Sequence, residues 1–104
     1  MKKKDFVDNP IEGIYRPFKI ESINSKTSIV MVSPGEKMKD GATSFKQYPL
    51  FLDEELIKAL PGFLGKDEKT IIGSTIHCLF IGENIVQLMN ANDKTFRQYL
   101  LEQN

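Results

Sequence analysis

Several short stretches of the chain alternate between apolar and polar residues, a period that is typical of half-buried β-strands. The first covers residues 14–21, where the apolar side chains fall on one face: Ile14, Phe18 and Ile20. A compact polar turn at residues 24–27 leads into residues 28–32, which are rich in β-branched side chains and too short for a typical helix. The two stretches together predict a β-hairpin.

A third strand and a short helix are predicted next. Residues 44–52 alternate again between two faces, and Pro49 indicates an edge or a bulge because proline cannot donate a ladder hydrogen bond. The period changes at residues 53–61, where acidic residues come first, as the helix dipole favours, and apolar residues follow at helical spacing. Pro61 and Gly62 predict the end of this helix.

The last third of the chain predicts two strands and a C-terminal helix. Residues 70–81 form a β-rich stretch with a bend at Gly73, and residues 85–89 form a fifth strand after a short turn. Asn92 or Asp93 is expected to cap the final helix. One face of that helix carries three apolar residues at helical spacing: Phe96, Tyr99 and Leu100.

The predicted order is therefore β-β-β-α-β-β followed by a C-terminal helix, which makes the chain mainly β. A helix between the third and fourth strands resembles the pattern of the OB-fold, a small five-stranded barrel whose face and loops bind oligonucleotides or oligosaccharides. An SH3-like barrel and an open antiparallel α+β sheet fit the same order. The 104 residues are expected to form a polar N-terminal lead-in, residues 1–10, and a single globular domain, residues 11–104.

The charge balance limits the kinds of partner. Fourteen Lys and Arg residues against fourteen Asp and Glu residues leave a formal charge of zero. The chain therefore lacks the overall attraction to polyanions on which general nucleic-acid binders rely. Residues 1–47 carry nine basic and six acidic side chains, and residues 48–104 carry five and eight. A nucleic-acid contact would have to use a local cluster of cations.

A single cysteine, Cys78, cannot form an internal disulfide, which favours a reducing compartment. The N-terminal stretch meets Asp5, Asp8 and Pro10 where a secretory signal needs apolar residues. The longest apolar runs have four residues, far short of the ~20 that cross a bilayer. We therefore expect a cytoplasmic protein without membrane contact.

Residues that carry catalysis or bind metals are scarce. His77 is the only histidine, and it neighbours Cys78 on a predicted strand, where adjacent side chains point to opposite faces. A Cys-His dyad is therefore not expected. The seven glycines match neither a P-loop nor a dinucleotide-binding motif, and one His with one Cys gives no metal site. The sequence predicts a protein without catalytic activity, cofactor or metal.

Aromatic and basic residues are interleaved in the first and third predicted strands. Single-stranded nucleic-acid binders use this combination because bases stack on aromatic rings while cations contact the phosphates. Phe18 and Phe45 are expected to pack in the core, whereas Tyr15 and Tyr48 lie on the faces that carry lysines and are expected to be exposed. The candidate nucleic-acid contacts are Tyr15, Arg16, Lys19, Lys26, Lys46 and Tyr48.

Two functions follow from these residues. The first is a small non-catalytic accessory protein that binds nucleic acid, single-stranded by expectation, on an OB-like barrel. The alternative is a protein-interaction module, such as an inhibitor or adaptor, that docks on a larger protein through its sheet or its C-terminal helix. The helix would use its apolar face: Phe96, Tyr99 and Leu100. Homodimer formation stays open as well.

Overall fold

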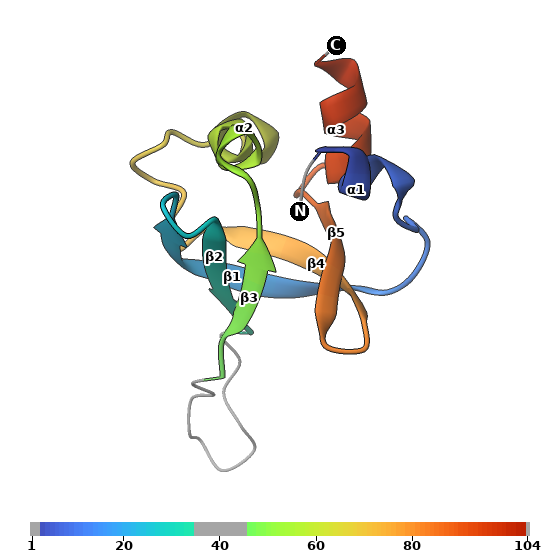
Figure 1. Ribbon diagram of the computed structural model, residues 1–104, viewed down its shortest axis with the longest axis horizontal. Helices are drawn as coiled ribbons and strands as arrows, with labels where there is room; N and C mark the ends of the chain where they lie inside the picture. The colour runs from blue at the N-terminus through green and yellow to red at the C-terminus, as the bar shows by residue number, and fades with distance from the viewer. Residues whose placement is uncertain (1–2, 35–45, 104) are drawn as a thin grey trace.

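The computed structural model describes residues 3–34 and 46–103, which form three helices and five strands (Figure 1). In chain order these are α1 (Lys3–Asp8), β1 (Tyr15–Asn24), β2 (Ile29–Ser33), β3 (Tyr48–Phe51), α2 (Glu54–Leu64), β4 (Thr75–Ile81), β5 (Asn84–Met89) and α3 (Phe96–Glu102). The fold is mainly β, with the predicted five strands, and α1 is a helix that the sequence pattern does not predict.

All five strands belong to one antiparallel sheet with the order β3-β2-β1-β4-β5. The central strand, β1, pairs with β2 from Lys19 to Asn24 and with β4 from Tyr15 to Lys19. The sheet curves strongly, so that its edge strands β3 and β5 lie on the same side of β1 and approach each other (Figure 1). The strand order does not close into a ring, and a closed barrel therefore stays a prediction.

Burial along β1 follows the predicted alternation only in part. Phe18 and Ile20 are buried while Lys19 between them is exposed, as a strand with one apolar face requires. Ile14 was expected on the same face, but it precedes the strand and is 83 % exposed. Between Ile20 and Ser22 the register with β2 shifts, which is the sign of a β-bulge.

The helix α2 is longer than the sequence pattern predicts. Pro61 stands inside it, and the chain stays helical to Leu64. The predicted end is wrong because Gly65, and not Pro61, supplies the left-handed conformation that ends a helix, with φ of 65° and ψ of 33°. The N–H of Gly65 donates to the carbonyl of Gly62, and the N–H of Lys66 donates to that of Pro61.

Thr95 caps α3, in place of the predicted Asn92 or Asp93. Its hydroxyl accepts a hydrogen bond of 3.2 Å from the N–H of Gln98, which satisfies a donor that the first turn leaves free. Asn92 and Asp93 belong to the preceding turn, where Asp93 has a positive φ of 60°. The buried side chains of α3 are Phe96 and Leu100.

The helix α1 lies beside α3, and both lie at the same end of the sheet as α2 (Figure 1). Phe6 is fully buried, and its ring meets that of Phe96 edge-on with centroids 5.1 Å apart. The side-chain amide of Gln87 donates to the carbonyl of Phe6, and Arg97 Nε donates to the carbonyl of Val7 over 2.9 Å. This part of the expected polar lead-in therefore packs into the core.

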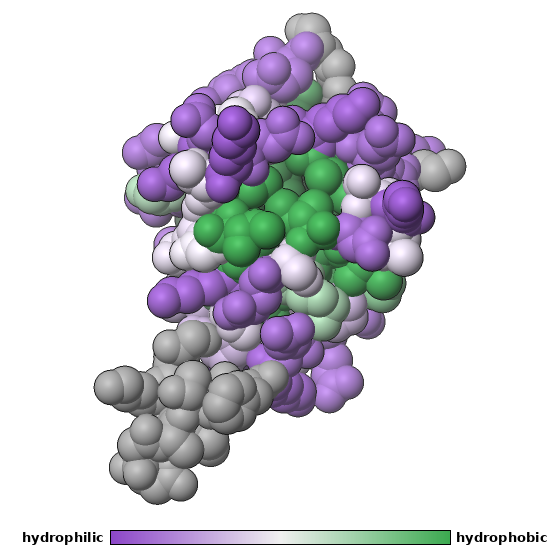
Figure 2. All heavy atoms as spheres, turned by 90° about the vertical axis from the view of Figure 1, so that its left-hand side faces the viewer, coloured by the Kyte–Doolittle hydropathy of each residue, from purple (hydrophilic) through white to green (hydrophobic). Residues whose placement is uncertain are grey.

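One face of the molecule carries apolar side chains at its centre, framed by polar ones (Figure 2). Single exposed apolar side chains are common on soluble proteins, whereas a continuous apolar patch framed by polar residues is typical of a contact surface. The large apolar side chains that stay exposed in the described part of the chain are Ile11, Ile14, Phe51, Ile72, Ile81 and Leu101.

Replacing Phe6 by alanine is expected to lower the free energy of unfolding by about 3–5 kcal/mol, because the change removes a ring from a packed core. Urea denaturation measures this difference. Ile14→Ala is the matched control at an exposed position, with an expected change within about 0.5 kcal/mol. A loss below about 1 kcal/mol for Phe6→Ala would show that α1 does not stabilise the core.

Candidate functional site

Three aromatic rings from three different strands meet on the inner face of the sheet. They belong to Phe18 in β1, Tyr48 in β3 and Phe80 in β4, and we call them the strand aromatic cluster. The ring centroids of Phe18 and Tyr48 are 5.7 Å apart, those of Phe18 and Phe80 5.2 Å, and those of Tyr48 and Phe80 5.3 Å. The rings meet edge-on or tilted, which is the arrangement that aromatic pairs favour.

The cluster lies at the end of the sheet opposite the helices. Tyr48 is the first residue of β3, whose other end leads to α2, and Phe80 shortly precedes the turn between β4 and β5 (Figure 1). Phe18 is only 2 % exposed, whereas Tyr48 and Phe80 are half-buried. Two rings that keep part of their surface in solvent therefore cover this end of the apolar interior.

Two exposed cations lie over rings of the strand aromatic cluster. The guanidinium carbon of Arg16 is 5.8 Å from the ring centroid of Phe18, and Lys46 Nζ is 5.0 Å from that of Tyr48. A cation–π contact at an exposed site contributes only about 0.5–1 kcal/mol, so each cation can move to another partner at small cost. The structure thus brings together three of the predicted contacts: Arg16, Lys46 and Tyr48.

Tyr48 is less exposed than the sequence pattern predicts. It shares a face of β3 with Leu50, which is 1 % exposed, because alternate residues of a strand point to the same side. Its ring therefore packs on the core and keeps only part of its surface in solvent. Phe45, the expected core partner of Phe18, lies outside the described residues. Phe18 packs against Tyr48 and Phe80.

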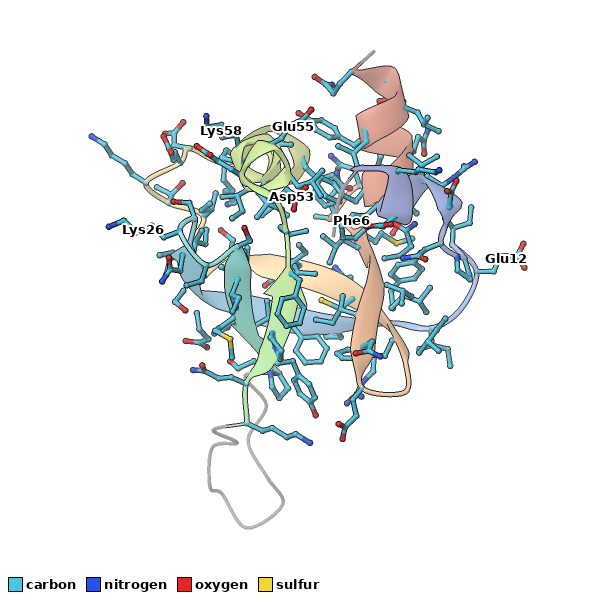
Figure 3. The ribbon with its side chains drawn as sticks, in the orientation of Figure 1. Phe6, Glu12, Lys26, Asp53, Glu55 and Lys58 are labelled. Carbon is cyan, nitrogen blue, oxygen red and sulfur yellow. The ribbon has the colours of Figure 1, made fainter. Side chains whose placement is uncertain are left out.

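The other three predicted contacts do not join the cluster. Tyr15 and Lys19 lie on the opposite face of β1 from Phe18, by the alternation of the strand. The hydroxyl of Tyr15 donates to the carbonyl of Ile11 over 2.6 Å, and burial raises the pKa of that phenol. Lys26 projects from the β1–β2 turn, level with the end of β3 that leads to α2 (Figure 3).

Phe80 is a residue of the cluster that the sequence analysis does not single out. The signal available in the sequence is its spacing, because Ile76, Cys78 and Phe80 alternate along one strand and the first two are fully buried. The register between β4 and β5 shifts at Leu79 and Phe80, which leaves Phe80 opposite Ile85. Local sequence does not predict such a shift.

The apolar face of α3 faces the interior. Phe96 is fully buried and Leu100 is 4 % exposed. The ring of Phe96 lies 5.1 Å from that of Phe6 and 4.8 Å from that of Phe63, and Tyr99 packs against both Phe63 and Phe96. We call these four rings the helix aromatic cluster. Because folding uses this face, α3 cannot present it to a partner without losing core contacts.

The two titratable side chains of β4, His77 and Cys78, lie on opposite faces of the strand and differ in burial. Cys78 is fully buried, and burial raises the pKa of its thiol to about 12, because a thiolate would lose its hydration. His77 on the other face is half-buried. In residues 3–34 and 46–103, no group of three or more His, Cys, Asp or Glu side chains could hold a metal ion. None of the helices described there is long and apolar enough to cross a membrane.

No protein-family model matches the chain, and comparisons with curated proteins and with solved structures found no match.

Replacing Cys78 by alanine is expected to remove a pH-dependent part of the stability. The pKa of the folded thiol, about 12, lies above the ~8.5 of an exposed thiol, so folding favours the protonated form. Its contribution is complete below about pH 8.5 and is lost as the pH rises toward 12. The difference in unfolding free energy between the native protein and Cys78→Ala should therefore narrow over this range.

The comparison uses urea denaturation at several pH values between 8 and about 11, at constant ionic strength. Lysines and tyrosines titrate in the same range in both proteins, so the difference isolates the thiol. A difference in unfolding free energy between the two proteins that stays constant or widens with pH would contradict the buried, protonated state of Cys78.

Proposed function

We propose that the protein is a small, non-catalytic nucleic-acid-binding protein that contacts single strands through the strand aromatic cluster. The observation that carries the proposal is the position of Arg16 and Lys46 over rings of the cluster, at the end of the sheet away from the helices. Single-strand binders combine aromatic rings for the bases with cations for the phosphates. The pair of exposed cations and half-buried rings supplies both.

Stacking on Tyr48 is the central contact of the proposal. In the free protein the ammonium of Lys46 lies over this ring, and a base that stacks there displaces it. A stacked base contributes about 1–3 kcal/mol, whereas the exposed cation–π contact that it replaces contributes about 0.5–1 kcal/mol. The exchange is favourable, and the released ammonium on its flexible stem can then pair with a phosphate.

Packing prepares Tyr48 for this contact. Its ring is held by Phe18 and Phe80, with centroids 5.7 and 5.3 Å away. A side chain that is already fixed loses little conformational entropy when a ligand binds, so more of the stacking energy appears as affinity. Phe80, itself half-buried, offers a second ring beside the first.

An OB-like barrel is part of the proposal, and the strand order supports it. A sheet ordered β3-β2-β1-β4-β5 becomes a ring if β3 and β5 meet. These two strands lie close enough to share a cleft of about 190 Å³, which both strands and the turn before β5 line. Its lining residues are Pro49, Phe51, Glu83, Asn84, Ile85 and Val86.

Substituting Tyr48 by leucine is expected to weaken binding of a labelled single-stranded oligonucleotide by about 1–3 kcal/mol, the contribution of one stacked base. Leucine keeps an apolar side chain on the core face, so the fold is retained while the stacking ring is lost. Fluorescence anisotropy at low salt measures the affinity, and thermal unfolding checks the fold.

Substituting Lys46 by methionine is expected to lower the slope of log affinity against log salt by about 0.7, the value for one phosphate contact with a single strand. Lys26→Met is the matched control, because it removes the same charge at a turn away from the cluster. If the two variants have the same slope of log affinity against log salt, Lys46 does not make the proposed phosphate contact. No binding by the native protein at low salt would overturn the proposed function.

A protein-interaction module is the second candidate, and the apolar patch framed by polar side chains favours it (Figure 2). Its contact would be a surface of the sheet or loops, since the apolar face of α3 packs in the core. An apolar protein interface changes little with ionic strength, whereas phosphate contacts weaken steeply. A complex with a protein that survives high salt, together with no affinity for oligonucleotides, would favour this candidate.

A further inference from the structure

The rings of the strand aromatic cluster are not parallel to one another. The planes of Tyr48 and Phe80 make an angle of 70°, and those of Phe18 and Tyr48 make an angle of 85°. A base stacks on a ring only when the two planes are nearly parallel. A base that stacks on Tyr48 therefore meets Phe80 with its edge. The next base of a stacked strand is parallel to the first, so it cannot stack on Phe80.

Tyr48 offers the stacking surface of the cluster. The ammonium of Lys46 lies over its ring, so this side of the ring is open to a group that displaces the ammonium. Phe18 is only 2 % exposed, and it packs against both other rings. Phe80 is half-buried and lies beside Tyr48. The cluster therefore offers one base a ring to stack on and a second ring at its edge.

The other exposed rings of β1 and β3 lie on the opposite face of the sheet. Phe51 is 50 % exposed, and it alternates with the inward-facing Tyr48 and Leu50 along β3. Tyr15 lies on the opposite face of β1 from Phe18, by the same alternation. Within the part of the chain that the structure describes, no row of exposed rings extends the strand aromatic cluster.

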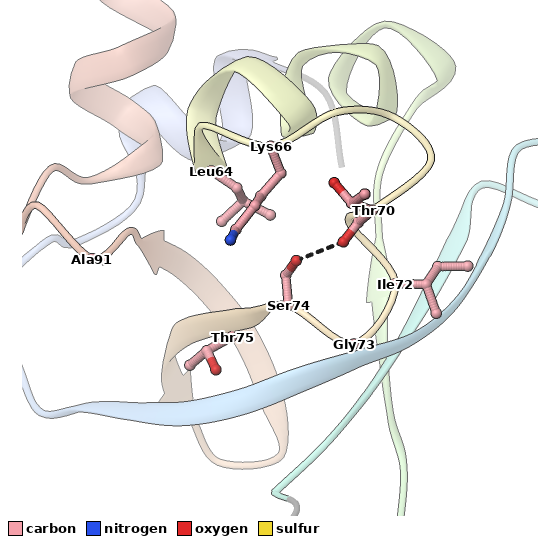
Figure 4. Close-up of a pocket in the computed structure, with 8 residues that line it drawn as sticks. All are labelled: Leu64, Lys66, Thr70, Ile72, Gly73, Ser74, Thr75 and Ala91. Atoms are coloured by element: carbon pink, nitrogen blue, oxygen red, sulfur yellow. Dashed lines mark hydrogen bonds between the residues drawn. The ribbon is translucent and has the colours of Figure 1, made fainter.

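The cavity at the other end of β4 does not extend this site. It measures about 510 Å³ and lies between the end of α2, the loop that leads to β4 and the turn after β5 (Figure 4). It reaches β4 at Thr75, whereas Phe80 lies near the other end of that strand. No residue of the strand aromatic cluster lines it. A strand bound at Tyr48 therefore cannot place its next base in this cavity.

The two cations of the site suit one nucleotide and its phosphates. Arg16 belongs to β1 and Lys46 precedes β3, and β2 lies between these two strands. Arg16 lies over the ring of Phe18, and Lys46 lies over that of Tyr48. A base inside a strand has one phosphate on each side along the backbone. The two phosphates beside a base at Tyr48 can therefore pair with different cations.

We propose that the strand aromatic cluster binds one unstacked base of a single strand, with the two phosphates beside it, and not a run of stacked bases. This inference rests on the proposed function and names the ligand of that site. In a stacked strand both faces of a base are covered by its neighbours, and Tyr48 takes the place of one neighbour. Opening a stack costs free energy, least where a base is already unpaired. The ligand is therefore a base in a loop, in a bulge or at a strand end.

The test uses the native protein and three nine-residue DNA strands that carry the same phosphates. One strand has nine thymines, one has a single central thymine among abasic residues, and one is abasic throughout. Competition against a labelled oligonucleotide at low salt, followed by fluorescence anisotropy, measures the three affinities. The single-thymine strand is expected to bind within about tenfold of the nine-thymine strand, which has more equivalent positions to offer. The abasic strand should bind about 5–150-fold more weakly than the single-thymine strand, the loss of one stacked base.

The outcomes separate this inference from the proposed function. If the nine-thymine strand binds more than about tenfold more tightly than the single-thymine strand, several bases stack at once, and the inference is wrong while the proposed function stands. Equal affinity for the single-thymine and abasic strands overturns the inference as well, because no base then contributes. If none of the three strands binds, the proposed function itself fails.

Two matched variants of β3 assign the base to Tyr48. Tyr48→Leu should remove the difference in affinity between the single-thymine and abasic strands, because leucine keeps an apolar contact with the core but has no ring. Phe51→Leu removes the exposed ring on the opposite face of the same strand, and should leave this difference unchanged. The reverse pattern overturns the inference. The comparison of strands on the native protein stays decisive if Tyr48→Leu does not fold.

Discussion

The pairing of β1 on both of its sides is the constraint on which the rest of the structure depends. β2 pairs with the half of β1 that ends at Asn24, and β4 pairs with the half that begins at Tyr15. One ten-residue strand therefore connects the β1–β2 hairpin with the β4–β5 hairpin. Both ladders include Lys19, and Phe18 lies next to this junction. Its ring is therefore reached by Tyr48 from β3 and by Phe80 from β4. The strand aromatic cluster is a product of this long-range pairing.

Two aromatic clusters divide the interior between them. The helix aromatic cluster joins α1, α2 and α3 at one end of the sheet, where the rings of Phe6 and Phe96 are fully buried. The strand aromatic cluster covers the other end, where Arg16 and Lys46 border it. Connectivity explains the difference, because α2 follows the end of β3, α3 follows β5, and α1 packs on α3. None of the helices that the structure describes covers the β4–β5 turn.

Local sequence predicts the strands because burial of one sheet face imposes a period of two on the residues. The same logic misses α1, since Phe6 is the one fully buried side chain among residues 4–8 and packs on Phe96 at the far end of the chain. The sequence pattern predicts Tyr48 as a site residue but overstates its exposure. The register of β3 against β2 determines which face of β3 packs on the core, and local sequence does not reveal that register. Phe80 joins the site through a register shift in β4. Pairings between strands that lie far apart in the sequence cannot be predicted from the local pattern of residues. The same pattern does not predict whether β3 and β5 close the sheet into a barrel.

The zero net charge of the chain decides which part of the proposed interface would matter most. Exposed charges separated by more than ~8–10 Å are screened at physiological salt, so distant lysines add little to the attraction of a phosphate. In the proposed interface, Arg16 and Lys46 would supply a contribution that falls as salt rises, whereas stacking on Tyr48 would depend little on salt. The rings would therefore provide the larger share of the proposed affinity at physiological salt. A packed tyrosine suits this role, because Phe18 and Phe80 already fix its ring in the free protein.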